Sequence, residues 1–117
     1  MKKNILIVGG SSSIGKKVTK NLSFKKFNIY TTSNNNNINT EKVKNFKINV
    51  KNLDEIKKLI KYFKKERIKF DYVVFLQGII YSSDLKGYTE EKILDILSVN
   101  TYSIIFFFKG DNKNFKK

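Results

Sequence analysis

The chain has 117 residues, which is enough for one modest hydrophobic core, so we expect a single domain over residues 1–117. It has no cysteine, which excludes disulfides and thiolate metal sites, and no histidine, the commonest neutral-pH base and metal ligand. The formal charge of +14 would favour binding to a polyanion. Only one basic residue is an arginine and the lysines are spread along the chain, so we expect solvated lysines and no nucleic-acid partner.

Apolar segments are too short to enter a membrane. The first apolar run, Ile5 to Val8, is shorter than the core of a signal peptide. The most apolar stretch, residues 94–108, contains polar residues and falls short of the roughly 20 apolar residues of a membrane span. We therefore expect a cytoplasmic protein.

The first half of the chain predicts a strand, a glycine turn, a helix and a second strand. Residues 4–8 predict a short buried strand, because Ile5 to Val8 form a continuous apolar run that ends at Gly9. After the serines, Ile14, Val18 and Leu22 recur at helical spacing. Residues 27–32 are rich in aromatic and β-branched residues and predict the second strand, before the polar loop 33–37.

The second half predicts two more strands, each followed by a helix. Phe46, Ile48 and Val50 alternate with polar residues as in a strand, and an amphipathic helix follows from Asn52. Residues 71–76 predict a buried fourth strand, and Thr89 is a candidate cap for a last helix that runs on to about residue 108. This order predicts an α/β fold: a Rossmann-like doubly wound parallel sheet of about four strands and three helices.

The loop after the first strand carries the most specific motif. The segment VGGSSSIG, residues 8–15, resembles the T-G-x-x-x-G-x-G loop of the short-chain dehydrogenase/reductase (SDR) family. Glycines there let the backbone approach a pyrophosphate, whose charge suits a helix N-terminus. Val8 stands where the family has threonine and Ser13 where it has glycine, so a positive φ at Ser13 would cost roughly 1 kcal/mol.

The resemblance extends to later strand ends and to the last helix. Asn49 and Val50 fall where the family binds adenine, and in the string DYVVFLQGI only Gly78 of the family's N-N-A-G remains. Asn100 matches the asparagine that in the family bends the helix and holds a water in the proton relay, so it is the candidate catalytic residue. The resemblance implies these coenzyme-binding residues: Gly9, Ser11, Ser12, Ser13, Ile14, Gly15, Thr32, Ser33, Asn34, Asn49, Val50, Gln77 and Gly78.

The resemblance implies that the chain is the N-terminal nucleotide-binding part of an NAD(P)-dependent oxidoreductase. Intact relatives transfer hydride between NAD(P)H and a carbonyl or alcohol. At the end of the second strand no carboxylate is present to hold a ribose 2′-hydroxyl, which favours NADP over NAD. The family's catalytic serine and Y-x-x-x-K do not follow Asn100, so we expect an incomplete domain that is inactive alone. The matching letters Tyr88 to Lys92 precede Asn100, and we interpret them as coincidence.

An incomplete sheet would leave apolar surface uncovered. We expect the fourth strand to be an edge and the last helix, with residues 104–108, to have an exposed apolar face through which the chain forms a homo-oligomer. Two alternatives remain open. One is a non-catalytic nucleotide-sensing Rossmann protein; the other is a basic nucleic-acid-binding module, which would show steep salt dependence.

Overall fold

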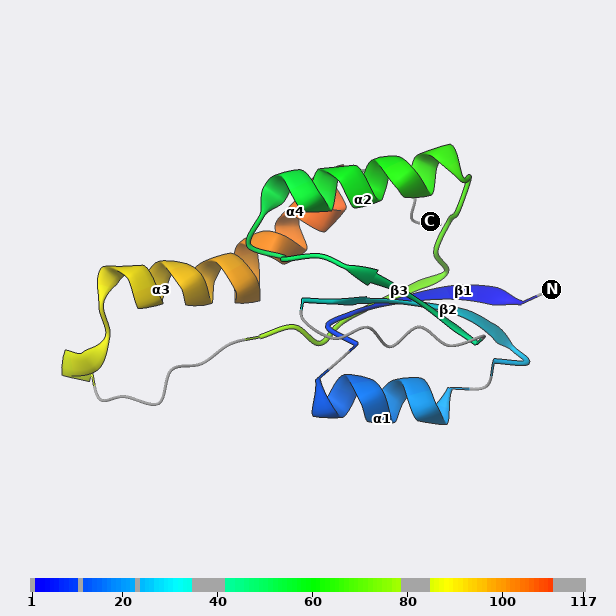
Figure 1. Cartoon of the computed structure of the whole chain (residues 1–117), viewed down its shortest axis with the longest axis horizontal. Coiled ribbons are helices and arrows are strands. Elements are labelled where there is room, and N and C mark those ends of the chain that lie inside the picture. Colours follow the sequence, from blue (N-terminus) through cyan, green and yellow to red (C-terminus); the bar gives the residue numbers. More distant parts are fainter. Residues whose placement is uncertain (1, 11, 23, 35–41, 79–84, 111–117) are drawn as a thin grey trace.

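A single parallel sheet organises the chain in the computed structural model, which describes residues 2–10, 12–22, 24–34, 42–78 and 85–110. Its strands are β1 (Lys3–Val8), β2 (Phe27–Ser33), β3 (Val43–Lys47) and β4 (Tyr72–Phe75), in the order β3-β2-β1-β4 (Figure 1). Ile5 of β1 lies opposite Ile29 of β2 and Tyr72 of β4. The chain moves outward from β1 through β2 and β3, then returns to the other side of β1, so the order reverses between β1 and β4.

Helices cover both faces of the sheet, which confirms the doubly wound α/β prediction. Helix α1 (Ser13–Asn21) lies on one face, and α2 (Leu53–Lys65) and α4 (Ser103–Gly110) lie together on the other (Figure 1). The predicted caps are also present. The Asn52 side chain accepts hydrogen bonds from the first-turn amides of α2, and the Thr89 hydroxyl accepts one from Lys92 N–H in helix α3 (Glu90–Leu97).

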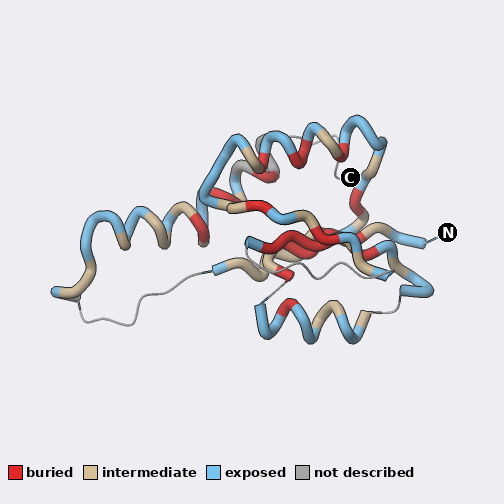
Figure 2. Tube along the Cα trace, in the orientation of Figure 1, coloured by how far each residue is buried: buried red, intermediate tan, exposed pale blue. Residues whose placement is uncertain are grey.

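Side chains alternate between two apolar layers, one on each face of the sheet. Leu6 and Val8 of β1 pack toward α2 and α4 in the larger core, which includes Phe63 and Phe107. The smaller core, on the α1 side, is built by a set of buried and half-buried apolar residues: Ile5, Ile7, Ile29, Val18, Leu22, Phe27, Val43, Val74 and Leu76. Figure 2 shows the buried positions concentrated in the sheet and on the inward faces of the helices.

Two details differ from the sequence prediction. The third strand ends at Lys47, so Ile48 and Val50 follow the strand; Ile48 is buried in the larger core because the chain turns there into α2. Ile14, in the first turn of α1, is 65% exposed although its spacing places it with Val18 and Leu22.

The predicted last helix is interrupted. After the short 3₁₀ helix η1 (Leu85–Gly87), α3 is joined to α4 by the π-helical segment η2 (Ser98–Tyr102). Helix α3 extends away from the sheet and lengthens the molecule to 52 × 28 × 23 Å (Figure 1). Exposed apolar side chains lie on it and just beyond it: Ile93, Leu94, Leu97, Tyr102 and Ile105.

The uncovered surface lies partly where we expected it. Within the described residues β4 has a strand neighbour on one side only, as predicted. On α4, Phe107 is buried in the core beside α2 while Ile105 is 51% exposed, and further exposed apolar side chains lie on α3. None of the helices in the described ranges is long and apolar enough to cross a membrane.

Candidate functional site

The loop after β1 is held tightly against its neighbours. Gly9 has a φ of 91°, which favours glycine, and a Cβ there would lie 2.7 Å from the backbone nitrogen of Gln77. A Cβ on Gly15 would lie 2.5 Å from the carbonyl oxygen of Gly9. These two glycines therefore let the loop, the first turn of α1 and the end of β4 meet with backbone against backbone.

The N-terminus of α1 opens beside this loop. Ser12 Oγ accepts a hydrogen bond from Gly15 N–H at 3.0 Å and donates one to the Gly9 carbonyl at 3.0 Å. In the described part of the chain the amides of Ser13 and Ile14 have no protein acceptor, and the first turn holds no acidic residue. Such a helix end attracts anions through its amides and its dipole.

Ser13 replaces a glycine of the family motif without strain. Among the described non-glycine residues only Arg67 has a positive φ, and Ser13 is the first residue of α1 with helical backbone. The cost that would follow from a positive φ therefore does not arise. Ser11, also predicted to bind coenzyme, lies outside the described residues.

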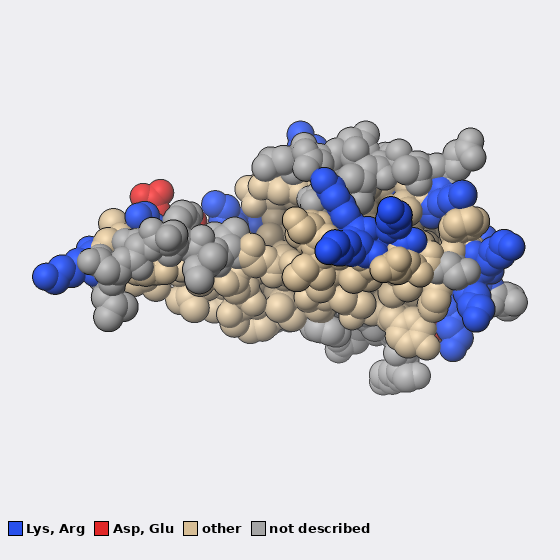
Figure 3. Space-filling model, turned by 90° about the horizontal axis from the view of Figure 1, so that it is seen from below, with Lys and Arg blue, Asp and Glu red and all other residues tan. Residues whose placement is uncertain are grey.

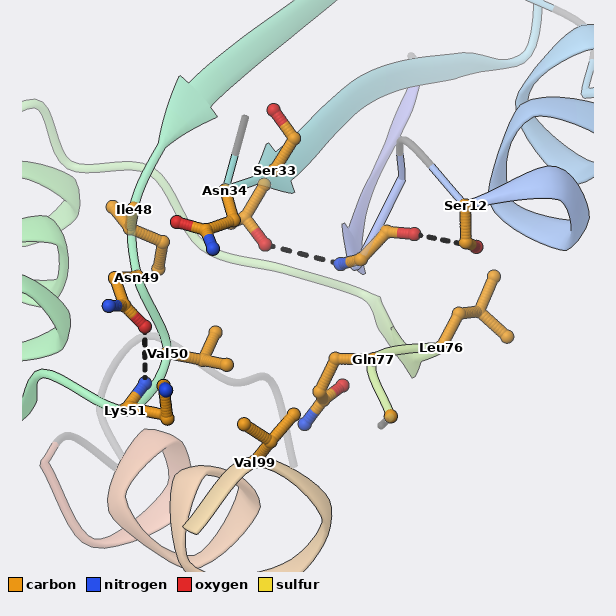
Figure 4. A pocket seen from close by; sticks show the side chains of 13 residues that line it. Ser12, Ser33, Asn34, Ile48, Asn49, Val50, Lys51, Leu76, Gln77 and Val99 are labelled. Carbon is orange, nitrogen blue, oxygen red and sulfur yellow. Dashed lines mark hydrogen bonds between the residues drawn. The ribbon is translucent and has the colours of Figure 1, made fainter. Parts of the chain in front are cut away.

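A pocket of about 350 Å³ lies at the carboxyl ends of β1, β2 and β4, where the strand order reverses (Figure 4). We call it the carboxyl-end pocket, defined by its lining residues: Gly9, Ser12, Thr32, Ser33, Asn34, Ile48, Asn49, Val50, Lys51, Leu76, Gln77, Gly78 and Val99. In open α/β sheets ligands bind at this position.

Most of the predicted coenzyme-binding residues meet in this pocket. The structure brings nine of them together there: Gly9, Ser12, Thr32, Ser33, Asn34, Asn49, Val50, Gln77 and Gly78. Ser13, Ile14 and Gly15 stand next to it in the first turn of α1. Sequence reasoning missed Ile48, Lys51, Leu76 and Val99; Leu76 could have been found, since it immediately precedes Gln77 at the end of β4.

Gln77 presents a buried acceptor that has no partner. Its amide nitrogen donates to Ser103 Oγ at 3.0 Å, which fixes the side chain against α4. Its Oε1 atom is buried and accepts no hydrogen bond within the described residues. Leaving such an atom unsatisfied costs about 1–3 kcal/mol, so a ligand that donates to it removes a penalty already present in the fold.

The segment after β3 forms the opposite wall. Asn49 Oδ1, expected to face adenine, accepts the Lys51 N–H at 3.0 Å, so this oxygen already shapes the turn into α2. Lys51 Nζ lies 3.5 Å from Asp95 of α3, and the pair ties the pocket wall to that helix. Among the described residues Lys51 is the only charged one that lines the pocket.

The end of β2 contributes neutral polar groups. The Thr32 carbonyl accepts hydrogen bonds from Gly9 N–H at 3.2 Å and Gly10 N–H at 2.9 Å, which joins the glycine loop to β2. Ser33 is buried and Asn34 is exposed at the pocket rim. No carboxylate lines this pocket in the part of the chain that the structure describes.

Asn100 lies beside the pocket, on the interrupted helix. It belongs to the π-helical segment η2, and a Cβ on Gly78 would lie 3.5 Å from its Oδ1. Single π-helical turns are frequent at functional sites. Tyr88 and Lys92 are instead at the far start of α3, where Lys92 Nζ donates to the Gly87 carbonyl, so they are not part of this site (Figure 1).

The strand order, the reversal beside β1 and the glycine loop define a Rossmann-like α/β fold. The family model described as short chain dehydrogenase matches residues 3–116. The chain belongs to the short-chain dehydrogenase family. No curated protein sequence matches it.

Solved structures show the same fold. A short chain dehydrogenase family protein from Francisella tularensis subsp. tularensis SCHU S4 matches with a TM-score of 0.89 and 26% identity, over 99% of this chain and 48% of that protein. A short chain dehydrogenase from Leptospira borgpetersenii with bound NAD⁺ has a TM-score of 0.83 and 17% identity, over 94% and 44%. ElxO with NADP bound has a TM-score of 0.77 and 23% identity, over 94% and 49%. The chain thus spans about half the length of these proteins.

Proposed function

We propose that the carboxyl-end pocket binds a nicotinamide dinucleotide and that residues 1–117 form one NAD(P)-binding unit. In this proposal the chain is the nucleotide-binding part of an oxidoreductase that transfers hydride between NAD(P)H and a carbonyl or alcohol. One observation carries the proposal: the amides of Ser13 and Ile14 have no acceptor among the described residues, and they open beside a pocket at the strand-order reversal. The pyrophosphate would lie against these amides.

The pocket residues fit such a ligand. Gly9 and Gly15 leave the loop without side chains that would cover the helix end. The unpartnered Gln77 Oε1 can accept a hydrogen bond from a ribose hydroxyl or an amide N–H, which are donors that a dinucleotide carries. When bound, the coenzyme supplies the hydride chemistry; these residues bind and orient it.

Asn100 is proposed to hold a water or a proton-relay group rather than the coenzyme itself. Its position next to Gly78 places it at the edge of the pocket. No Tyr-x-x-x-Lys sequence follows it within these 117 residues. We expect the purified 117-residue chain to bind coenzyme weakly and not to oxidise NADPH in the presence of carbonyl compounds.

A preference for NADP over NAD follows from charge. Among the described residues no carboxylate lines the pocket, so a ribose 2′-phosphate would meet no lining anion there, and the Lys51 ammonium, which lies 3.5 Å from Asp95, is the cation it could contact. The related structures include both coenzymes, since ElxO has NADP bound and the Leptospira protein has NAD⁺ bound. Titration of the chain with NADPH and with NADH tests the preference, and equal Kd values would contradict it.

Binding itself is tested by thermal unfolding of the purified chain with increasing NADPH. A ligand that binds only the folded state raises Tm in proportion to RT ln(1 + [L]/Kd). We expect a rise with NADPH and none with equal concentrations of nicotinamide alone, which lacks the pyrophosphate. The absence of any rise up to millimolar NADPH would refute the proposal.

We further propose that the exposed apolar side chains on α3 and η2 join copies of this chain. Leu94 is 51% exposed, and the exposed side chains of Ile93 and Leu97 lie nearby on the same helix. Contiguous exposed apolar surface of this kind marks association sites.

A further inference from the structure

A second hollow lies at the opposite end of the sheet, where the strands begin. It measures about 540 Å³. We call it the lysine hollow, defined by its lining residues: Lys2, Lys3, Lys25, Lys26, Phe27 and Tyr72. A strand of six residues separates the two ends of β1, so the hollow is about 20 Å from the carboxyl-end pocket. It plays no part in the function proposed above.

The sheet register brings these residues together from three parts of the chain. Lys3 N–H donates to the Lys26 carbonyl at 3.0 Å, which holds the turn before β2 against the start of β1. Phe27 is the partner of Lys3 in the sheet, and Tyr72 begins β4 opposite Ile5. Lysines that look dispersed in the sequence therefore converge in the fold.

The charge in the lysine hollow is uncompensated. No carboxylate lines it, and none of its lysines has an ion-pair partner among the described residues. The neighbouring Asp71 carboxylate is engaged with Asn4 N–H at 2.8 Å. Figure 3 shows blue side chains gathered at the end of the molecule opposite α3, with no red visible there. Four ammonium groups around one concavity raise the local concentration of anions.

Two aromatic rings lie between these cations. The Phe27 and Tyr72 rings meet edge to face with centroids 6.2 Å apart, and Tyr72 is 48% exposed. Lys3 Nζ lies 5.6 Å from the centroid of the Tyr72 ring and 3.5 Å from its hydroxyl. The hollow thus offers an exposed ring with cations beside it, the combination on which a base can stack while phosphates contact ammonium groups.

We propose that the lysine hollow binds single-stranded nucleic acid, with phosphates on the lysines and one base against Tyr72. A membrane surface fits less well, because lipid headgroups meet a flat basic face and need no concavity with an aromatic ring in it. Double-stranded nucleic acid fits less well too, because its bases are stacked on one another and cannot reach the ring.

The test is fluorescence anisotropy of a labelled oligothymidylate of about ten nucleotides with the 117-residue chain. With four phosphate contacts, the plot of log K against log salt should have a slope of about −3. Replacing Lys2, Lys25 and Lys26 by Gln should weaken binding at least about tenfold at low salt and bring the slope to about −1. The matched control replaces Lys57, Lys58 and Lys61 of α2, which removes the same charge away from the hollow, and should bind like the parent.

The stacking contact is tested separately. Tyr72→Leu should weaken binding by about tenfold, and Tyr72→Phe, which keeps the ring, should restore it. Saturating NADPH should leave oligonucleotide binding unchanged because the two sites lie at opposite ends of β1. Thermal unfolding of each variant shows whether it is folded. If Tyr72→Leu does not fold, the lysine variant and its α2 control still test the proposal.

Several outcomes would overturn the proposal. These are equal loss of binding in the α2 control, no loss in Tyr72→Leu, or binding of inorganic polyphosphate as tight as that of the oligonucleotide. Binding to vesicles of anionic phospholipid without binding to the oligonucleotide would assign the hollow to a membrane surface instead. None of these results bears on coenzyme binding, which is measured independently at the other end of the sheet.

Discussion

A Cβ on Gly15 would lie 2.5 Å from the Gly9 carbonyl oxygen and 2.8 Å from the Gly10 carbonyl carbon. These contacts are with backbone atoms, which cannot move aside as a side chain could. Gly15→Ala should therefore push α1 away from the loop, lower the free energy of unfolding by about 1–3 kcal/mol and abolish the Tm rise with NADPH. Ser13→Ala, two residues earlier and exposed, is the control and should change stability by less than about 0.5 kcal/mol. Retained NADPH binding in a folded Gly15→Ala variant would contradict the assigned phosphate position.

A substitution at Gln77 distinguishes an effect on coenzyme binding from an effect on stability. Gln77→Met keeps the length of the side chain and removes both the unpartnered Oε1 and the hydrogen bond to Ser103. The loss of the hydrogen bond destabilises the fold, whereas the loss of a buried, unsatisfied acceptor stabilises it. The two effects oppose each other, so the free energy of unfolding should change by less than about 1 kcal/mol. The Kd for NADPH should rise at least about fivefold if Oε1 accepts a bond from the coenzyme. An unchanged Kd would show that the ligand does not reach this atom.

Lys51 is expected to select the phosphorylated coenzyme. Lys51→Gln removes the one charge that the described residues place on the pocket wall, and it breaks the exposed pair with Asp95, which should cost less than about 1 kcal/mol of stability. In this variant the Kd for NADPH should rise while the Kd for NADH stays the same. In the parent chain the preference for NADPH over NADH should weaken as salt is added, because salt screens the charge of Lys51. Parallel titrations measure both constants. An equal loss for the two coenzymes would mean that Lys51 acts on their shared pyrophosphate or on the fold.

Leu94 tests association through α3. Leu94→Lys places a charge in the exposed apolar surface without disturbing a buried contact. Sedimentation velocity over a range of concentrations should show self-association of the parent chain and mainly monomer for the variant, with Tm nearly unchanged. Asn21→Lys adds the same charge at the end of α1 and should associate like the parent. A parent chain that remains monomeric at high concentration would refute the proposed role of α3.

Local sequence patterns predicted the strands and the helix caps, because these features depend on residues that are neighbours in the sequence. The apolar run at β1, the cap at Asn52 and the cap at Thr89 each depend on a few adjacent positions, and all three are confirmed. The alternation of Phe46, Ile48 and Val50 misled the prediction of β3. Ile48 and Val50 are apolar because they face α2 and the pocket after the strand has ended.

Residues that reach a site from elements far apart in the sequence could not be predicted in the same way. Lys51 and Val99 reach the carboxyl-end pocket because the turn after β3 and the segment η2 meet there in space. The lysine hollow was missed for a related reason: its cations come from two sequence pairs, Lys2 with Lys3 and Lys25 with Lys26, that only the pairing of β1 with β2 unites. The π-helical interruption also has no sequence signal beyond Asn100 itself.

The position of β1 also constrains the order in which the chain folds. Its first neighbour in the sequence, β2, begins at Phe27, whereas its other neighbour, β4, begins at Tyr72. Just before β4, the Asp71 carboxylate accepts a hydrogen bond from Asn4 N–H, a contact between residues 67 positions apart. Closing that long loop costs conformational entropy that only the completed core repays. We expect β1, β2 and α1 to assemble first, and the pairing of β1 with β4 to limit the rate of folding. During synthesis, the edge of β1 that pairs with β4 therefore stays unpaired, and its apolar residues stay partly exposed, until β4 has been synthesised.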